Sequence, residues 1–313
     1  MSAILSVLII PHRHGFGHFH RSYLLYNNIK RFESCFVKML LHPDFVNVFD
    51  HISLFCESDN IIFDYIIIDS NDHMHINNSI SNFPNSKVII YTDLKDPIPI
   101  PNSYIFAPFC QNKPSPYSFN GLDYYMVDKL NKRSLSENLN LSNILVSFGS
   151  IDETNNLFFV INKIFELNLE SRYNYHFLIG KDYLYKQYID EYLSTRNDES
   201  LFFYSPSFDT IYDFFLLGDV LIGCCGLTTY EALHFGLPVV NIVQNDLQNS
   251  NAQFLKDEFG MPNLGYYPDD NSFYETMCNY LPKNFTILKN KASSIISGNG
   301  LDLVTKELLK ILQ

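Results

Sequence analysis

The stretch ILSVLIIPHRHGFGHFHR, residues 4–21, decides the fold that the sequence predicts. Its first part, ILSVLII (4–10), is a short apolar run of the kind that forms a buried strand. Gly15 and Gly17 then permit a tight turn, and the amphipathic segment over 18–32 predicts a helix. A strand that passes through a glycine turn into a helix begins a strand–helix–strand unit, which predicts a parallel sheet.

The same alternation of apolar runs and amphipathic segments continues through most of the chain and predicts an α/β protein. Buried strands are expected at 4–10, 35–41, 65–69, 87–93 and 104–109, with helices at 18–32 and 43–51. The polar stretch over 111–143 is typical of a loop or linker. Further strands are expected at 144–150, 175–180, 201–206, 220–226 and 238–243, and helices at 155–167, 182–193, 208–217, 228–235, 251–259 and 301–313.

The break near residue 140 predicts two Rossmann-like domains, residues 1–140 and 141–313, with parallel sheets and a C-terminal helix. In open sheets of this type, ligands bind beyond the carboxyl ends of the strands. If two such domains face each other, the expected ligand site is the cleft between them.

The composition excludes several classes of function. The 313 residues carry a net charge of −12, and the basic residues are scattered, which disfavours binding to nucleic acid. The six cysteines show neither a CxxC pair nor a framework spacing, so we expect a reducing, cytoplasmic environment. The N-terminal apolar run is too short for a membrane span and lacks a basic segment before it, so no integral membrane association is expected.

The glycine turn brings His18 and Arg21 to the start of the first helix. A histidine at that position can act as a general base, because the helix dipole favours its neutral form. Arg21 lies one turn further on, so both side chains are expected on one helix face, where they would meet an anionic or sugar ligand. Gly17 allows the ligand to approach the backbone closely.

A metal site is the main alternative for this histidine-rich turn. His18 and His20 are two residues apart on the expected helix and therefore point in nearly opposite directions. His12 and His14 would face one way only if the turn stays extended, and no carboxylate lies near them in the sequence. We therefore favour a catalytic loop for His18, and packing or solvated roles for the other histidines.

Two stretches of the second half are candidates for binding a nucleotide. Gly149 and Ser150 end a strand in FGSIDETN (148–155), where Asp152 and Thr154 are expected to cap the next helix. Gly226 ends another strand, and the helix start at Leu227, Thr228 and Thr229 offers free amides and hydroxyls to a diphosphate. Glu231 would accept hydrogen bonds from ribose hydroxyls or only complement the helix dipole, and Gln248 and Asn251 begin a polar segment aimed at the same pocket.

These stretches, in this order, resemble the GT-B superfamily of nucleotide-sugar enzymes. The stretch over 223–255 is similar to the nucleotide-binding segment of the lipid II-forming N-acetylglucosaminyltransferase, with T-x-x-E at 228–231, G-L-P at 236–238 and Q-x-x-N-A at 248–252. The G-x-G-H-x-x-R pattern at 15–21 resembles the UDP-sugar hydrolase of pseudaminic acid biosynthesis, as does G-S-x-D-x-x-N at 149–155. The segment GLDYYMV (121–127) also fits that hydrolase family.

The resemblance implies a GT-B fold and the hydrolysis of a UDP-sugar, with no cofactor and no metal. His18 would activate a water that displaces UDP from a diacetamido-trideoxy-hexose with inversion, with Arg21 as the second catalytic residue. The implied nucleotide-binding residues are Gly149, Ser150, Gly226, Leu227, Thr228, Thr229, Glu231 and Gln248, and the implied sugar-binding residues are Gly17, Asn71 and Asn251.

The sequence departs from the hydrolase pattern at three places. Asn71 stands where that family usually has a tyrosine, Asp128 stands in place of an arginine, and the run over 247–249 lacks a carboxylate. All three places belong to the sugar side of the expected site. A glycosyltransferase in which His18 activates a hydroxyl of a glycan acceptor is therefore the main alternative, and a subunit that binds a sugar nucleotide without catalysis is another.

Overall fold

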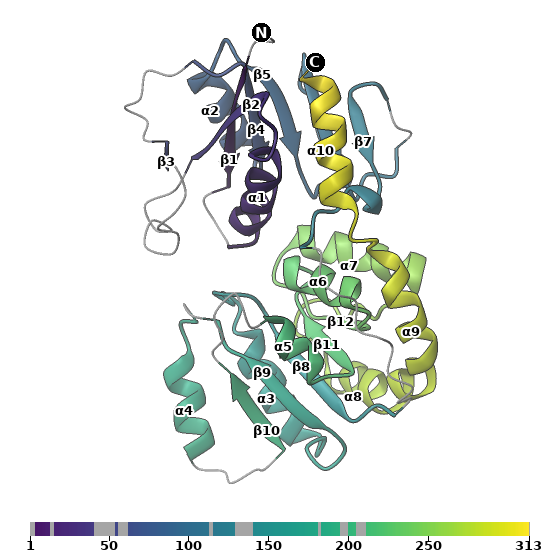
Figure 1. Ribbon diagram of the computed structural model, residues 1–313. Coiled ribbons are helices and arrows are strands. Elements are labelled where there is room, and N and C mark those ends of the chain that lie inside the picture. The colour runs from purple at the N-terminus through teal and green to yellow at the C-terminus, as the bar shows by residue number, and fades with distance from the viewer. Residues whose placement is uncertain are drawn as a thin grey trace. The chain divides into compact units, whose positions relative to one another are not determined.

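The computed structural model describes residues 4–12, 16–40, 54–55, 62–112, 115–128, 140–180, 183–194, 200–204 and 211–312. The chain forms two compact units, one of Met1–Lys129 with Gly298–Gln313 and one of Leu130–Ser297. Each unit is built on a parallel sheet with helices packed against it (Figure 1). The predicted helix over 43–51 lies outside the described residues, as do His14 and Gly15.

The sheet of the first unit has the strand order β3-β2-β1-β4-β5-β6-β7. Its strands are β1 (Leu5–Pro11), β2 (Cys35–Leu40), β3 (Leu54–Phe55), β4 (Tyr65–Asp69), β5 (Lys87–Tyr91), β6 (Ser103–Ala107) and β7 (Ser118–Asn120). The order reverses between β1 and β4, because β1 leads to β2 on one side and the chain then returns to β4 on the other. Connections that leave in opposite directions open a crevice at the carboxyl ends of these two strands.

Both faces of this sheet are buried, as expected for parallel strands. Val7 and Ile9 of β1 pack into one apolar cluster, which includes residues of α1 (Phe16–Ile29) and α10 (Gly300–Ile311). Leu8 and Ile10 point to the other face and join a cluster that includes Ile76 of α2 (His73–Asn82). Alternate side chains of β1 therefore pack against helices on the two faces of the sheet, and this packing holds the carboxyl end of the strand in place.

The second unit contains a sheet with the order β10-β9-β8-β11-β12. The strands are β8 (Asn143–Ser147), β9 (Asn174–Leu178), β10 (Leu201–Tyr204), β11 (Val220–Gly223) and β12 (Val239–Asn241). The helices of this unit are α3 (Asn156–Glu166), α4 (Lys186–Ser194), α5 (Ile211–Leu216), α6 (Leu227–Phe235), α7 (Asp246–Phe259), α8 (Asp270–Glu275), the π-helical segment η4 (Thr276–Tyr280) and α9 (Leu281–Ile295). Here the order reverses between β8 and β11, so the crevice of this unit lies beyond those two strands.

The C-terminal helix is present but belongs to the first unit, so the predicted assignment of all of 141–313 to the second domain is wrong. Val304, Leu308 and Leu312 lie in the same apolar cluster as residues of β1 and α1. The Asn28 side chain of α1 also donates a hydrogen bond to the Thr305 hydroxyl at 2.9 Å. The apolar stripe of α10 is therefore satisfied by α1 and not by the sheet that precedes it in the sequence.

The expected loop over 111–143 is also partly wrong, because Ser118–Asn120 forms β7 and Leu122–Tyr124 forms the short 3-10 helix η2. The predicted helix over 251–259 begins earlier, at Asp246, where the Asn245 side chain caps it by accepting from the Gln248 amide. Helices α2, α8 and α9 were not predicted. Ile76 of α2, Phe273 of α8 and Phe285 of α9 are buried, so tertiary packing stabilises these helices.

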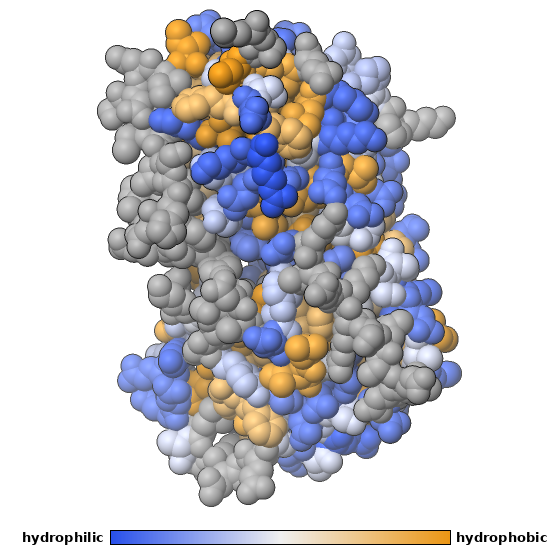
Figure 2. Space-filling view, in the orientation of Figure 1, coloured by the Kyte–Doolittle hydropathy of each residue, from blue (hydrophilic) through white to orange (hydrophobic). Residues whose placement is uncertain are grey.

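The surface mixes polar and apolar side chains. On the face shown in Figure 2, hydrophilic and hydrophobic residues are interspersed over both units. Large apolar side chains are exposed at Ile62, which is 79% exposed, and at Leu184 of the second unit, which is 69% exposed. Within the described parts of the chain, no helix is long and apolar enough to cross a membrane.

Candidate active site

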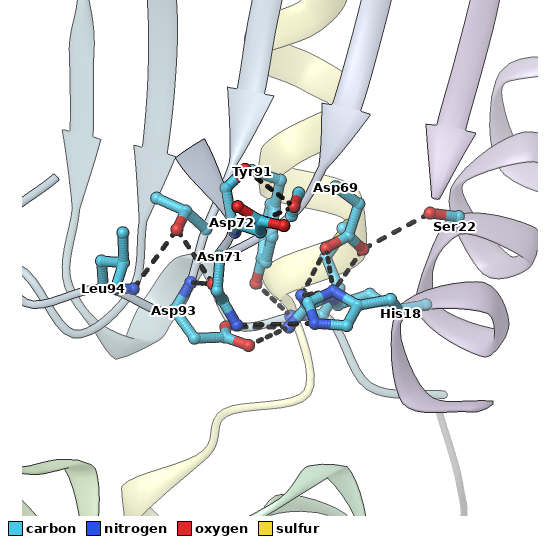
Figure 3. Close-up of polar contacts among 12 residues, drawn as sticks. His18, Ser22, Asp69, Asn71, Asp72, Tyr91, Asp93 and Leu94 are labelled. Carbon is cyan, nitrogen blue, oxygen red and sulfur yellow. Dashed lines mark hydrogen bonds and ion pairs between the residues drawn. The ribbon is translucent and has the colours of Figure 1, made fainter. Parts of the chain in front are cut away.

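The crevice between β1 and β4 contains a histidine paired with a buried carboxylate (Figure 3). His18 lies in the first turn of α1, and Asp69 is the last residue of β4. The His18 Nδ1 atom lies 2.7 Å from Asp69 Oδ1. The register of the sheet explains the contact, because Pro11 at the end of β1 pairs with Asp69. Because β1 ends beside Asp69 and α1 is the next described element, His18 in the first turn of α1 lies at the end of β4.

The Asp69 carboxylate is buried, and a cation keeps it charged. Its side chain is 3% exposed, and Arg21 donates to it from Nε at 2.9 Å and from one terminal nitrogen at 2.5 Å. Burial by itself would raise the pKa of Asp69, but the charges of Arg21 and His18 and their hydrogen bonds outweigh burial. The pKa of Asp69 therefore lies well below its ordinary value, and the group is a carboxylate at neutral pH.

Arg21 contacts the carboxylates of Asp69 and Asp93. Its side chain is 3% exposed, and its other terminal nitrogen donates to both oxygens of Asp93 at 2.8 and 3.0 Å. The guanidinium also lies 4.3 Å from the centre of the Tyr91 ring. Arg21 thus pairs with two carboxylates in the described structure, and a contact with an anionic ligand stays a prediction. Arg21 holds Asp69 in place and keeps it charged.

The hydrogen bonds assign the tautomer of His18. A carboxylate only accepts, so Nδ1 of His18 donates to Asp69 at 2.7 Å, and in the neutral ring Nε2 then carries the lone pair. A terminal nitrogen of Arg21 also lies 3.2 Å from Nδ1, but a guanidinium is itself only a donor, so with this tautomer that contact is not a hydrogen bond. The Asn71 Nδ2 atom lies 3.4 Å from this Nε2, which is consistent with an amide that donates to it. The side chains of His18 and Asp93 are each 17% exposed, whereas those of Asp69 and Arg21 are 3% exposed. An imidazole that is oriented by a buried carboxylate and partly exposed in this way can act as a base.

The other histidines of the turn differ in their surroundings. The His12 ring packs edge-on against His18 and against His75, with ring centres 5.5 and 5.0 Å apart, and its Nε2 lies 3.8 Å from Asp72. Burial lowers the pKa of His20, with the Asp128 charge acting in the opposite direction. Among the residues that the structure describes, no group of three or more His, Cys, Asp or Glu side chains could hold a metal ion.

The crevice of the second unit is formed partly by a turn with unusual backbone angles. Gly149, Asp152 and Asn155 all have positive φ, at 84°, 49° and 56°. Such angles are costly for residues other than glycine and persist where the surroundings impose them. Asp152 caps α3 as expected, because its two oxygens accept from the amides of Asn156 and Leu157 at 3.0 and 2.8 Å. The hydroxyl of Thr154, the other expected cap, has no hydrogen-bond partner among the residues that the structure describes.

A glutamine joins this turn to the segment after β12. The Gln244 side-chain amide donates to Asp152 Oδ1 at 2.9 Å and to the Phe148 carbonyl at 3.2 Å. The Gln248 side-chain oxygen in turn accepts from the Gln244 backbone amide at 2.8 Å. Two of the expected nucleotide-binding stretches are therefore linked within the second unit. Gln248 belongs to this link in the described structure.

The second of the expected stretches also includes the start of α6. Gly226 is the N-cap of α6, and a glycine has no side chain that could cap the helix. Gly226, Leu227 and Thr228 are partly exposed, whereas Thr229 and Glu231 are 1% and 5% exposed. Asn251, on α7, is also buried. Anion binding at this helix start stays a prediction.

Within the first unit, the structure brings together His18, Arg21 and Asn71, three of the residues that the sequence indicated, and places Gly17 next to His18 in the first turn of α1. Sequence reasoning missed Asp69 and Asp93, which end or follow the apolar strands YIIID and KVIIY. An acidic residue at the carboxyl end of a predicted parallel strand was the available signal, because such ends meet at one edge of the sheet. Within the second unit, the turns after β8 and β11 flank the crevice predicted for the nucleotide.

Comparison with known proteins finds solved structures with a similar fold and a relative that matches part of the chain. No family model matches the chain. The uncharacterized protein MJ1062 of Methanocaldococcus jannaschii is 28% identical over 126 residues, which are 40% of this chain and 25% of that protein. The match therefore spans only a quarter of the length of this relative.

Several solved structures are similar to the chain over nearly its whole length. MurG from Acinetobacter baumannii superposes with a TM-score of 0.68 at 14% identity, covering 98% of this chain and 99% of its own. UDP-GlcNAc 2-epimerase from Neisseria meningitidis, solved with UDP-GlcNAc bound, gives a TM-score of 0.68 at 12% identity, with 98% and 100% covered. The spinosyn rhamnosyltransferase SpnG in complex with thymidine diphosphate gives a TM-score of 0.66 at 12% identity, with 96% and 99% covered. At these identities the likeness shows the architecture, and the chain has the GT-B fold of two parallel-sheet α/β units with a C-terminal helix.

Proposed function

We propose that the protein is an enzyme that uses a UDP-sugar and displaces UDP from the anomeric carbon with His18 as the general base. The observation that carries this proposal is the pair of His18 and Asp69, with Nδ1 and Oδ1 2.7 Å apart. The buried Arg21 keeps the carboxylate charged, and the carboxylate fixes the tautomer whose Nε2 can take a proton. A structural histidine needs no such support.

The proposed reaction is a nucleophilic displacement at the anomeric carbon. A hydroxyl oxygen bonds to the anomeric carbon, and its proton passes to Nε2 of His18. The bond from the anomeric carbon to the diphosphate oxygen breaks, and its electron pair leaves with UDP. Asp69 stabilises the imidazolium that forms, because it already accepts the hydrogen bond from Nδ1. Attack from the face opposite the leaving group gives inversion.

The second unit supports the nucleotide half of the proposal. The start of α6, at Gly226, Leu227, Thr228 and Thr229, has a glycine N-cap without a side chain, and a helix N-terminus favours a diphosphate. Gly149 and Ser150 lie across the crevice of the same sheet, in the turn with positive φ angles. Glu231 is proposed to meet the ribose, and Gln248 the nucleotide; Gly17, Asn71 and Asn251 are proposed to meet the sugar.

The nucleophile decides between two versions of this enzyme. With water, the protein is a nucleotide-sugar hydrolase that acts on a diacetamido-trideoxy-hexose, the version that we favour from the sequence motifs. With a sugar hydroxyl, it is a glycosyltransferase, a version supported by similarity to the rhamnosyltransferase SpnG. We propose a cytoplasmic location for either version, since the free thiols suit a reducing compartment.

A panel of nucleotide sugars, assayed for free UDP with and without glycan acceptors, tests the proposal. Release of UDP from a UDP-diacetamido sugar without acceptor is the expected result, and release that needs an acceptor would assign the transferase version. Conversion to an isomeric sugar nucleotide without accumulation of UDP would contradict both versions.

His18→Ala then tests the assignment of the base. We expect turnover to fall by roughly 10²–10⁴-fold, the usual contribution of general base catalysis. His73→Gln, a change at a neighbouring histidine on α2, is the matched control and is expected to keep its activity. Full activity in His18→Ala would contradict the proposed role of His18.

A further inference from the structure

Asn71 sits beside the nitrogen that would accept the proton, and its side chain can face only one way. Its Oδ1 atom accepts from the Thr92 hydroxyl at 2.9 Å and from the Asp93 backbone amide at 2.7 Å. Both partners are donors here, so the side-chain oxygen must point toward them and cannot exchange places with the amide nitrogen. The Nδ2 group is therefore turned toward His18, as Figure 3 shows.

The partner of that amide is the free lone pair of the imidazole. Asp69 holds the proton on Nδ1 of His18, so Nε2 accepts, and Asn71 Nδ2 lies 3.4 Å from it. This separation is at the long end of hydrogen bonding, so the bond between amide and imidazole is weak and can be exchanged for another. A fixed donor and a fixed acceptor thus lie side by side at the partly exposed edge of the His18 ring.

We propose that Asn71 and His18 together bind the attacking hydroxyl, with Asn71 as a second residue that contacts the nucleophile. The hydroxyl proton points to Nε2 of His18, and the hydroxyl oxygen accepts from Nδ2 of Asn71. One oxygen thus replaces the weak contact between the two side chains. The proposal rests on the proposed function, and it deepens that function by naming what orients the nucleophile. It applies equally to water and to a sugar hydroxyl.

The charged and titratable groups around His18 leave this role to Asn71. Asp69 of β4 contacts Nδ1 at 2.7 Å, and Arg21 of α1, whose terminal nitrogen also lies 3.2 Å from Nδ1, donates to Asp69 and Asp93. His12, after β1, contacts the His18 ring edge-on and in turn lies near Asp72 and His75 of the α2 end. Tyr91 of β5 lies under Arg21, and its hydroxyl donates to the Tyr124 carbonyl. The described contact at Nε2 is the Asn71 amide.

Asn71→Asp is the sharpest test, because it keeps the size of the side chain and replaces the donor by an acceptor. One carboxylate oxygen can still accept from Thr92 and from the Asp93 amide, while the other faces Nε2. We expect kcat for UDP release to fall by roughly 10–100-fold, part of the usual effect of general base catalysis, with KM for the UDP-sugar changed less than about twofold. Because the new carboxylate favours a protonated ring, the acidic limb of the pH–rate profile should move to higher pH.

Two further variants serve as controls. Asn77→Asp places the same new charge on the exposed surface of α2 and should keep both kcat and the pH profile. Thr92→Val removes one of the two donors that orient Asn71 and should lower kcat by a smaller factor, roughly 3–10-fold, since the Asp93 amide remains.

Nitrogen NMR of histidine-labelled protein gives a readout that needs no turnover. We expect resting wild-type protein to show His18 with a protonated Nδ1 and a free Nε2, and Asn71→Asp to show a ring protonated at both nitrogens at neutral pH. A wild-type ring with its proton on Nε2, or Asn71→Asp with wild-type kcat and pH profile, would overturn the role of Asn71 while UDP release still supports the proposed function. A wild-type protein that releases no UDP from any sugar nucleotide would overturn both.

Discussion

The Asp69 carboxylate accepts from three side chains of α1. It receives a hydrogen bond from Nδ1 of His18, two from the Arg21 guanidinium and a longer one from the Ser22 hydroxyl at 3.4 Å, and it is 3% exposed. Removing the carboxylate charge therefore changes both the tautomer of the base and the environment of a buried cation. These two effects can be measured separately.

Asp69→Asn tests the first effect. The amide keeps the size of the side chain but can present a donor to Nδ1, so the proton of His18 is no longer held on that nitrogen. We expect turnover to fall by roughly 10²–10⁴-fold, as for the loss of a general base, with little change in the affinity for UDP. Asp96→Asn, at an exposed position after β5, is the control. Activity within about twofold of wild type in Asp69→Asn would contradict a catalytic role for the pair.

Arg21→Met tests how much the buried cation contributes to stability. The substitution leaves the carboxylates of Asp69 and Asp93 without their shared cation, in a site where Asp69 is almost fully buried. Removing one partner of a buried ion pair costs about 3–5 kcal/mol, which we expect as a loss in the free energy of unfolding measured with urea. Arg31→Met, at an exposed position at the end of α1, should change stability by less than about 0.5 kcal/mol.

The lowered pKa of Asp69 also predicts a dependence of stability on pH. A carboxyl group with a depressed pKa in the folded state stabilises the protein above its unfolded pKa, about 3.9, and loses that contribution as the pH falls toward the folded pKa. Between about pH 5 and pH 3, wild-type protein should therefore lose stability more steeply than Asp69→Asn, by up to about 1.4 kcal/mol per pH unit. If the free energy of unfolding in urea changes with pH by the same amount in both proteins over this range, the predicted contribution of Asp69 is contradicted.

At the scale of elements, the turn between β8 and α3 is held from several sides. Gln244 bonds to its Phe148 carbonyl and its Asp152 carboxylate, and the Tyr267 hydroxyl donates to the Thr154 carbonyl at 2.7 Å. The Tyr183 hydroxyl donates to the Asn155 side chain. These contacts stabilise the three positive φ angles of the turn and give it one conformation before any ligand arrives.

Changing either of two glycines near this turn to alanine should destabilise the protein, for a different reason in each case. A Cβ at Gly180, after β9, would lie 2.1 Å from the Ser150 carbonyl oxygen, so the turn must shift. A Cβ at Gly149 would meet nothing within 4 Å, but the φ of +84° is strained for alanine. We expect Gly149→Ala to lose about 1–2 kcal/mol of stability, and Gly180→Ala to lose about 1–3 kcal/mol.

Binding of UDP, measured by calorimetry, separates the two variants further. Gly180→Ala should weaken binding more, because it displaces the backbone of Ser150. Equal affinities in wild type and Gly180→Ala would mean that this turn does not contact the nucleotide.

At the scale of the whole molecule, the chain returns to its first unit after completing its second. Helix α10 packs on α1, and Gly300 approaches the Tyr125 carbonyl so closely that a Cβ there would lie 2.0 Å from its oxygen. The last 16 residues, Gly298–Gln313, thus complete the core of a unit whose other residues end at Lys129. Stability of the first unit therefore depends on the C-terminus.

Leu308→Ala tests this dependence. Leu308 is 1% exposed and lies in the cluster that contains β1 and α1, so its truncation should cost about 2–5 kcal/mol. The loss should appear in the amides of the first unit in hydrogen exchange, while those of the second unit keep their protection. Lys306→Ala, at an exposed position of the same helix, is the control. Loss of protection confined to the second unit would contradict the assignment of α10.

Much of the fold was predictable because its strands are short apolar runs with polar ends. The run YIIID was expected as a strand over 65–69 and forms β4 at those residues. The packing of α10 on the first unit was not predictable, since its apolar stripe indicates that one face is buried but not which partner buries it. The polar and proline residues around 118–120 predict a loop, yet this segment pairs with β6 at the edge of the sheet.

The α/β class and the two parallel sheets could be predicted from the sequence, because apolar runs that alternate with amphipathic segments are local patterns. The sequence also indicated His18 as a candidate, but what surrounds His18 depends on the tertiary structure. Asp69 is 51 residues away and carries no local signal beyond its place at the end of a strand; the parallel pairing of β1 with β4 brings it within 2.7 Å. The same pairing makes Arg21 the buried counter-ion of Asp69. Periodicity records which side chains are buried, whereas partners across a sheet are set by register, and register is a property of the folded chain.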